Sequence, residues 1–209
     1  RDTLQDQYEW YFKMVQETDC KSLEFVHFCP TPTHLSREQV KQHVVDDIRY
    51  ISDLAGKYNA IAVYEFLGSD KLPVNNLADT MEILDRADCE NIRWVFDFYQ
   101  FYSSDRSFES LSKADVQTLY LVHISDSKDL PYKELAAPKS ERLLPGDGVC
   151  PTKKILKTLH KIGYSGPFLI ELYNPEFMNM DPSEFAREAK EKTLSVLGKY
   201  FNAENDNSL

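Results

Sequence analysis

Four side chains that can bind metals or transfer protons each end a short apolar run of the chain. They are Glu65, Asp97, His123 and Glu171, and the runs before them are rich in β-branched and aromatic residues, as is typical of buried strands. An ionised group is costly to bury without a partner, so four such groups at strand ends would destabilise an ordinary hydrophobic core. At the carboxyl end of a barrel of parallel strands, however, these groups would meet where active sites are built.

Three carboxylates and one imidazole make a mostly hard ligand set, which suits Mn²⁺, Co²⁺ or Mg²⁺. Zn²⁺ is the fourth candidate, although zinc sites more often carry additional imidazole or thiolate ligands. In the alternative interpretation, each residue simply ends its strand and meets solvent or a basic side chain. We favour one bound divalent metal ion, because several like charges buried together need a counter-ion.

Composition narrows the class of partner. The chain has 209 residues and a formal net charge of -10, which disfavours nucleic acid because a phosphate backbone binds a basic face. No apolar stretch is long enough to span a bilayer, so we expect no membrane partner. Four cysteines without a CxxC spacing are typical of a reducing compartment. The expected location is therefore the cytoplasm, and the acidic surface itself is interpreted as a solubilising one.

Helix and strand patterns alternate along the whole chain. Helical spacing of apolar residues covers residues 4–15, 40–55, 77–84, 108–114, 155–162 and 182–200, and strand-like runs cover 22–29, 60–65, 92–97, 118–123 and 168–171. Ser36 and Gln39 have capping-box spacing, Asn75 or Asn76 can cap the third helix, and Asp181 followed by Pro182 predicts the start of the last helix. The segment from Ser125 to Cys150 reads as irregular, and its length makes it a candidate lid.

Alternating strands and helices predict an α/β fold with a parallel sheet. We expect a (β/α)8 TIM barrel of which this chain holds the last five βα units, as one partial domain over residues 1–202 with a frayed tail over 203–209. Five strands cannot close such a barrel. Either the first three strands lie upstream of Arg1, or the open edges pair with another chain, for example in a homo-oligomer.

Several short segments, taken in order, resemble one known family. They are Tyr64-Glu-Phe-Leu-Gly68, Val95-Phe-Asp97, Val122-His-Ile-Ser-Asp126, Pro145-Gly-Asp-Gly148 and Ile170-Glu-Leu172. From Arg1 to about Asn202 the chain resembles the xylose isomerase-like TIM-barrel superfamily of sugar isomerases and epimerases. Within it, the chain looks most like the inosose (2-keto-myo-inositol) isomerases of inositol catabolism.

The resemblance implies roles for individual residues. Glu65, Asp97, His123 and Glu171 match the four metal ligands of the family, and Glu65 and Glu171 also match its catalytic pair of carboxylates. Arg142 matches an arginine that contacts substrate oxygens. The implied reaction moves a proton on a small sugar or cyclic polyol ketone through an enediolate, with one carboxylate removing the proton and the other returning it.

One position departs from the family pattern and keeps alternatives open. The family often has a histidine three residues after the metal-binding aspartate, where this chain has Gln100. Inosose isomerases have a further histidine two places on, where this chain has Tyr102. A glutamine can bind a substrate hydroxyl but cannot hold a proton. A non-catalytic sugar- or metal-binding relative is therefore one alternative. A dehydratase acting on a similar polyhydroxy ketone is another, because both reactions begin with the same proton abstraction. A DNA-repair endonuclease of the same superfamily is disfavoured by the charge. His27, near the first strand, is a further candidate for lining the pocket.

Overall fold

The computed structural model describes residues 4–135, 142–198 and 200–201. The chain divides into two compact units, residues 1–95 and 96–209, and each is described by itself. Strand β3 (Ile92–Asp97) runs through the boundary, so Asp97 at its end belongs to the second unit. The expectation of one domain over residues 1–202 stays a prediction, and the predicted frayed tail lies outside the described residues.

The first unit is built of three parallel strands and their helices. Its elements before β3 are α1 (Leu4–Glu17), β1 (Ser22–Val26), α2 (Arg37–Lys57), β2 (Ile61–Glu65) and α3 (Leu77–Ala87). Strand β2 pairs with both β1 and β3, and all three run in the same direction. The register places Val26 and Val95 on either side of Glu65, so the three strands end at nearly the same level.

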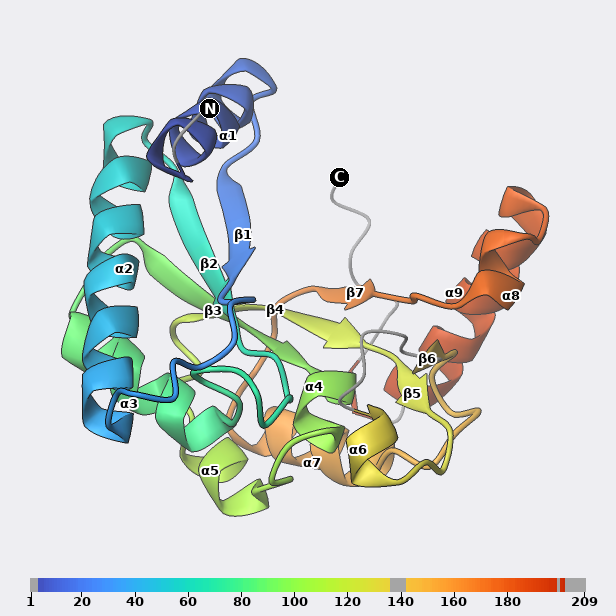
Figure 1. Cartoon of the computed structure of the whole chain (residues 1–209). Coiled ribbons are helices and arrows are strands. Elements are labelled where there is room, and N and C mark those ends of the chain that lie inside the picture. Colours follow the sequence, from blue (N-terminus) through green and yellow to red (C-terminus); the bar gives the residue numbers. More distant parts are fainter. Residues whose placement is uncertain (1–3, 136–141, 199, 202–209) are drawn as a thin grey trace. The chain divides into compact units, whose positions relative to one another are not determined.

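Local sequence explains where the helices of this unit begin. Ser36 and Gln39 form the predicted capping box at the start of α2, in which the Gln39 N–H donates to the Ser36 hydroxyl and the Ser36 N–H donates to Gln39. Asn76 caps α3 by accepting from the Asp79 N–H. Figure 1 shows α2 running alongside the strands of this unit. The apolar stripe of α2 is buried, as predicted.

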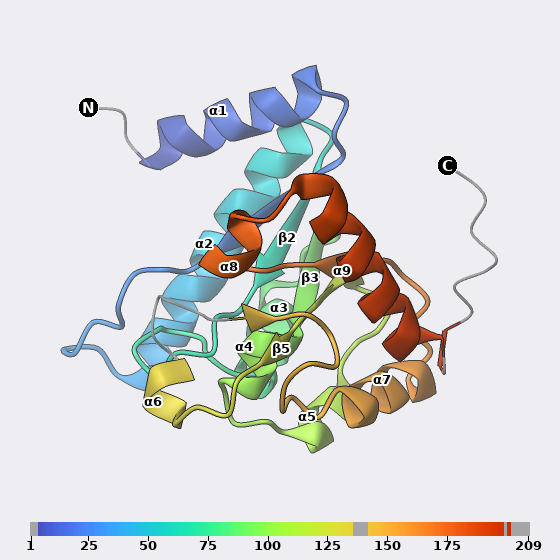
Figure 2. The same cartoon turned by 90° about the vertical axis from the view of Figure 1, so that its right-hand side faces the viewer.

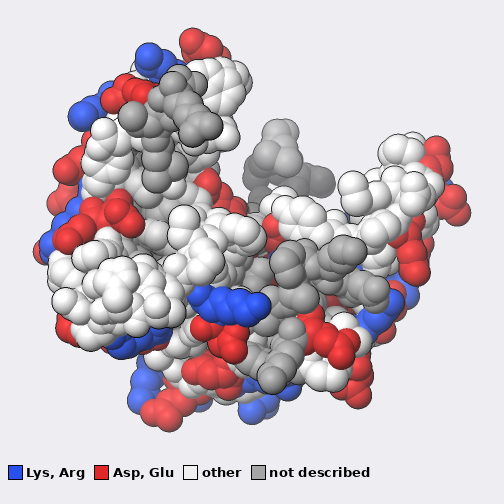
Figure 3. Space-filling view, in the orientation of Figure 1, with Lys and Arg blue, Asp and Glu red and all other residues white. Residues whose placement is uncertain are grey.

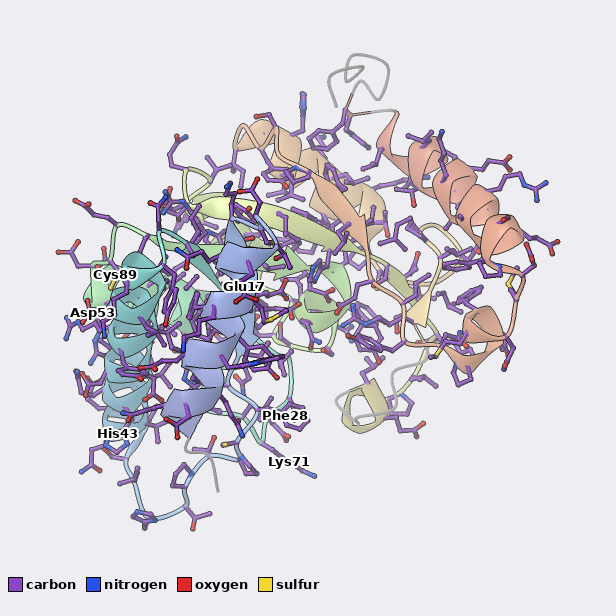
Figure 4. The ribbon with its side chains drawn as sticks, turned by 90° about the horizontal axis from the view of Figure 1, so that it is seen from above. Glu17, Phe28, His43, Asp53, Lys71 and Cys89 are labelled. Atoms are coloured by element: carbon purple, nitrogen blue, oxygen red, sulfur yellow. The ribbon has the colours of Figure 1, made fainter. Side chains whose placement is uncertain are left out.

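The loops at the carboxyl ends of β1 and β2 are joined. Phe28 and Lys71 lie on these loops (Figure 4), and the Thr31 N–H donates to the Lys71 carbonyl at 2.8 Å. Parallel strands leave their connecting loops on the same end of the sheet, so loops that follow neighbouring strands can bond to each other. This backbone bond ties together the loops that flank the end of β2.

The second unit contains the remaining elements. They are α4 (Phe98–Tyr102), α5 (Phe108–Lys113), β4 (Leu119–Ile124), β5 (Asp126–Ser127), α6 (Tyr132–Leu135), β6 (Arg142–Leu143), α7 (Thr152–Lys161), β7 (Phe168–Ile170), α8 (Pro175–Met178) and α9 (Pro182–Leu197). Strands β4 and β7 pair in parallel, and α7 and α9 lie side by side (Figure 2). Asp181 and Pro182 start α9 as predicted, because the Asp181 carboxylate accepts from two N–H groups of the first turn.

The prediction of an irregular segment from Ser125 to Cys150 is wrong in part. Strands β5 and β6 within it form an antiparallel ladder in which Asp126 pairs with Leu143 and Ser127 with Arg142. Helix α6 also lies in this segment, whereas residues 136–141 lie outside the described residues. Two-residue strands and single helical turns are too short to produce a periodic pattern. For the same reason α4 and α8 were not predicted.

The described surface carries charged side chains of both signs. No helix in the described ranges is both long and apolar enough to cross a membrane. In Figure 3 acidic side chains are interspersed with basic ones over the visible face, which shows no continuous basic patch among its described residues. A broad basic face of the kind that binds a phosphate backbone is therefore not seen there.

Candidate metal and active site

Three of the four predicted ligands come together in the second unit. Asp97 ends β3, His123 lies near the end of β4, and Glu171 directly follows β7. The parallel register pairs His123 with Leu169. Side chains two residues apart share a face of a strand, so Glu171 projects from the same face as His123.

The distances suit a shared cation. The His123 Nδ1 atom lies 3.4 Å from Glu171 Oε2 and 3.8 Å from Asp97 Oδ2. One ligand atom from each of the three residues lies within 4.8 Å of the others. Oxygen and nitrogen ligands at about 2.1 Å from one ion are up to about 4.2 Å apart, so small side-chain shifts would complete the coordination. The donor set therefore fits one divalent cation.

Asp97 is held by the helix that it starts. Its Oδ1 atom accepts a hydrogen bond from the Gln100 N–H at 2.6 Å, which makes Asp97 the N-cap of α4. The second oxygen, Oδ2, is thereby turned toward His123 and Arg142. Gln100 itself is half-buried in the first turn of α4, close in sequence and space to the Asp97 carboxylate.

Arg142 is part of this cluster rather than a residue of a solvated loop. Its Nη1 atom donates to Asp97 Oδ2 at 2.6 Å and to Glu171 Oε2 at 2.7 Å, and the residue is only 3% exposed. The guanidinium lies 4.9 Å from the ring centroid of Tyr99 and 5.8 Å from that of Tyr173. A cationic group between two carboxylates reduces the cost of burying both charges.

Two residues outside the predicted ligand and substrate-binding set hold the backbone around Arg142. Asn174, at the start of α8, donates from Nδ2 to the Arg142 carbonyl at 3.0 Å. Asp126 accepts from the N–H groups of Ser127 and Cys150 at 2.8 Å and of Gly146 at 3.0 Å. For Asn174 the sequence signal is the following Pro175, because Asn-Pro favours the start of a helix. For Asp126 the signal is its place three residues after His123, because an aspartate there can accept hydrogen bonds from nearby backbone N–H groups.

The electrostatic surroundings shift the pKa values of Glu171 and Asp97 in opposite directions. Burial opposes ionisation of Glu171, but hydrogen bonding to His123 and the charge of Arg142 outweigh it and lower its pKa to about 2. Complete burial raises the pKa of Asp97, against the opposing charge of Arg142. Glu171 is therefore ionised at neutral pH and is a ready anionic partner for a cation.

Glu65 and His27 belong to the first unit. Glu65 is buried at the end of β2, in register with Val95, which lies two residues before Asp97 on β3. The His27 Nε2 atom lies 3.3 Å from Asp47 of α2, and its ring packs beside Tyr64. Neighbouring side chains of a strand alternate between faces, so Tyr64 and Glu65 point to opposite faces of β2. His27 lies on the Tyr64 side, and we leave it out of the site.

The chain is similar to several known proteins. A family model described as "Xylose isomerase-like TIM barrel" matches residues 5–195. An inosose isomerase of Bacillus licheniformis is 33% identical over 194 residues, covering 91% of this chain and 69% of that protein. A crystal structure of the IolI protein with a bound zinc atom superposes with a TM-score of 0.87 at 27% identity, covering 94% and 69% of the two chains. A 3-dehydroshikimate dehydratase of Pseudomonas aeruginosa is 24% identical over 64% of this chain and 21% of that protein.

Proposed function

Because the chain belongs to the xylose isomerase-like TIM barrel family, we propose that it is a metal-dependent isomerase or epimerase of a small sugar or cyclic polyol ketone. Family membership confirms the predicted fold class. The convergence of Asp97, His123 and Glu171 within 4.8 Å of one another carries the proposal. The inosose isomerase relative supports inosose as the first substrate to test.

Four residues would hold the cation: Glu65, Asp97, His123 and Glu171. Glu65 is included because it is buried, ends its strand, and neighbours the strand that carries Asp97. A bound divalent cation would polarise the ketone and an adjacent hydroxyl and stabilise the negative charge that develops on them. This ligand set is compatible with Mn²⁺, Co²⁺, Mg²⁺ or Zn²⁺.

The two glutamates would divide the proton transfer between them. One carboxylate removes the proton from the carbon beside the ketone, and the other returns it to the neighbouring carbon or to the opposite face. Arg142 would bind substrate oxygens. Gln100 would bind a hydroxyl without taking part in proton transfer.

The test uses the full chain, stripped of metal with a chelator and reloaded with one divalent ion at a time. Inosose and ketohexoses are offered in D₂O, and both turnover and deuterium incorporation are followed by NMR. We expect metal-dependent exchange that falls by at least about a hundredfold in Glu171→Gln and Glu65→Gln. The exposed Asp129→Asn serves as the matched control. An absence of both metal binding and proton exchange would contradict the proposal.

A dehydratase is the second candidate, supported by the similarity to a 3-dehydroshikimate dehydratase. Removal of a proton beside a ketone begins both reactions, so the same carboxylates would serve either one. The products separate the two candidates, because a dehydratase releases water and leaves a conjugated enone with ultraviolet absorbance. Tight sugar binding without deuterium incorporation would instead indicate the non-catalytic relative.

A further inference from the structure

One buried serine in the second unit has a hydroxyl that the fold does not use. Ser125 directly follows β4 and is fully buried, and its Oγ atom makes no hydrogen bond to any residue that the structure describes. A buried hydroxyl without a hydrogen bond is costly, and most such groups in native proteins are paired. The Ser125 hydroxyl is therefore a donor and acceptor whose partner has to come from a ligand or from water.

Strand geometry places Ser125 on the face that carries the site. Side chains two residues apart share a face of an extended chain, so Ser125 projects from the same face as His123. The β5–β6 ladder gives the same result, because Ser127 pairs with Arg142 and side chains directly opposite each other share a face. Ser125 therefore lies on the same face as a proposed ligand and as the arginine that binds two others.

The backbone is fixed on both sides of Ser125. Ile124 pairs with Ile170 in the β4–β7 ladder, and Asp126 pairs with Leu143 in the β5–β6 ladder. The Asp126 carboxylate also accepts hydrogen bonds from three backbone N–H groups. A short side chain on a fixed backbone loses little further freedom when a ligand binds to it, which favours binding.

The neighbouring groups of the site leave a role for this hydroxyl. A polyol hydroxyl both donates and accepts hydrogen bonds, whereas Arg142 only donates and a cation binds only lone pairs. The carboxylates of Asp97 and Glu171 already accept from Arg142. The Ser125 oxygen can accept a hydrogen bond from a substrate hydroxyl, and its own O–H can donate one to a neighbouring oxygen.

We propose that Ser125 is a substrate-binding residue that accepts a hydrogen bond from one hydroxyl of the polyol ketone, an inference that rests on the proposed function. This bond gives the buried hydroxyl its partner only when substrate is present. No hydrogen bond inside the described protein has to break first, so the new bond adds directly to binding. Removal of the hydroxyl should therefore weaken substrate binding without destabilising the unliganded chain.

The first test compares Ser125→Ala with Ser104→Ala, in thermal unfolding of the unliganded chain and in kinetics with inosose. Ser104 is also buried, but its hydroxyl donates to the Phe101 carbonyl at 2.9 Å. Ser104→Ala should lower the unfolding midpoint by about 3 °C and change KM by less than about twofold. Ser125→Ala should keep or raise the midpoint and lower kcat/KM about tenfold, mainly through KM. An unchanged KM, or a midpoint that falls as far as that of Ser104→Ala, would overturn the inference.

Binding of unreactive probes separates this inference from the proposed function. The metal-loaded full chain is titrated with myo-inositol and with its monodeoxy analogues, each of which lacks one hydroxyl. Ser125→Ala should bind myo-inositol about tenfold more weakly than the wild type, and one analogue should bind equally to both. That analogue identifies the hydroxyl that Ser125 contacts.

The outcomes of the titration are distinct from those of the turnover assay. If the wild type turns over neither inosose nor a ketohexose, the proposed function fails, and the probe titration alone decides the role of Ser125. Three results would overturn the inference: equal binding of myo-inositol by the wild type and Ser125→Ala, a further loss in Ser125→Ala with every analogue, or no binding of myo-inositol by the wild type.

Discussion

The Nη1 atom of Arg142 lies 2.6 Å from Oδ2 of Asp97, in an ion pair from which solvent is almost fully excluded. The same nitrogen also reaches Glu171. Removing one partner of a buried pair leaves an uncompensated charge, which costs more than the pair itself contributes. This relationship makes the stability of the second unit sensitive to changes at the proposed active site.

Arg142→Ala should lower the free energy of unfolding by about 3 kcal/mol, because Asp97 and Glu171 would be left facing each other. Urea unfolding followed by circular dichroism measures the change. Arg187→Ala, at an exposed position of α9, is the matched control and should change stability by less than about 0.5 kcal/mol. Equal effects of the two substitutions would show that the buried pair is not formed in solution.

Asp126→Asn should destabilise the chain by about 2 kcal/mol. Three backbone N–H groups converge on this buried carboxylate, and the amide would direct an NH₂ group at one of them. The exposed Asp129→Asn controls for the loss of charge. Thermal unfolding of both variants provides the comparison, and an unchanged midpoint for Asp126→Asn would argue against the carboxylate's role in holding Gly146 and Cys150.

Two glycines should respond differently to alanine. A Cβ atom on Gly148 would lie 2.6 Å from Asp126 Oδ1 and 2.8 Å from the Ser127 nitrogen, so the backbone would have to move at a cost of about 3 kcal/mol. Gly163 ends α7 with φ +88°, and a Cβ there meets nothing within 4 Å. Its substitution should cost only about 1 kcal/mol of backbone strain. Chemical denaturation ranks the two variants, and a reversed order would contradict the packing around Gly148.

Asp79 should make stability depend on pH in the first unit. Partial burial opposes its ionisation, but hydrogen bonds from Lys41, Asn76 and Arg37 outweigh it and lower the pKa of Asp79. Because the folded pKa lies below the unfolded one, the stabilisation is fully present above the unfolded pKa of 3.8 and is lost as the pH falls through the folded pKa.

Asp79→Asn should therefore cost about 1 kcal/mol at pH 7 and progressively less below about pH 4. Urea midpoints measured from pH 7 down to pH 2.5 would show this convergence. Asp85→Asn, at an exposed site on the same helix, should run parallel to the wild type. A gap between Asp79→Asn and the wild type that stays constant over this range would indicate that Asp79 does not act through its charge.

The sequence by itself determined the order of the principal strands and helices and the strand-end positions of four candidate ligands. Periodicity, capping residues and prolines act over a few neighbours, so the capping box at Ser36 and the helix start at Asp181 could be predicted without a fold. The resemblance to a family came from short segments in a characteristic order, and the family model confirmed it.

Only the tertiary structure decided what surrounds those ligands. Arg142 meets Asp97 across 45 residues of sequence, and the β5–β6 ladder that positions it is too short to leave a periodic signal. The face on which His27 lies depends on strand register and on the proximity of Asp47, neither of which is encoded locally. Long-range pairing and burial arise only in the folded chain, and they determine the electrostatics of the site. Local sequence patterns determine only which residues stand at the ends of strands.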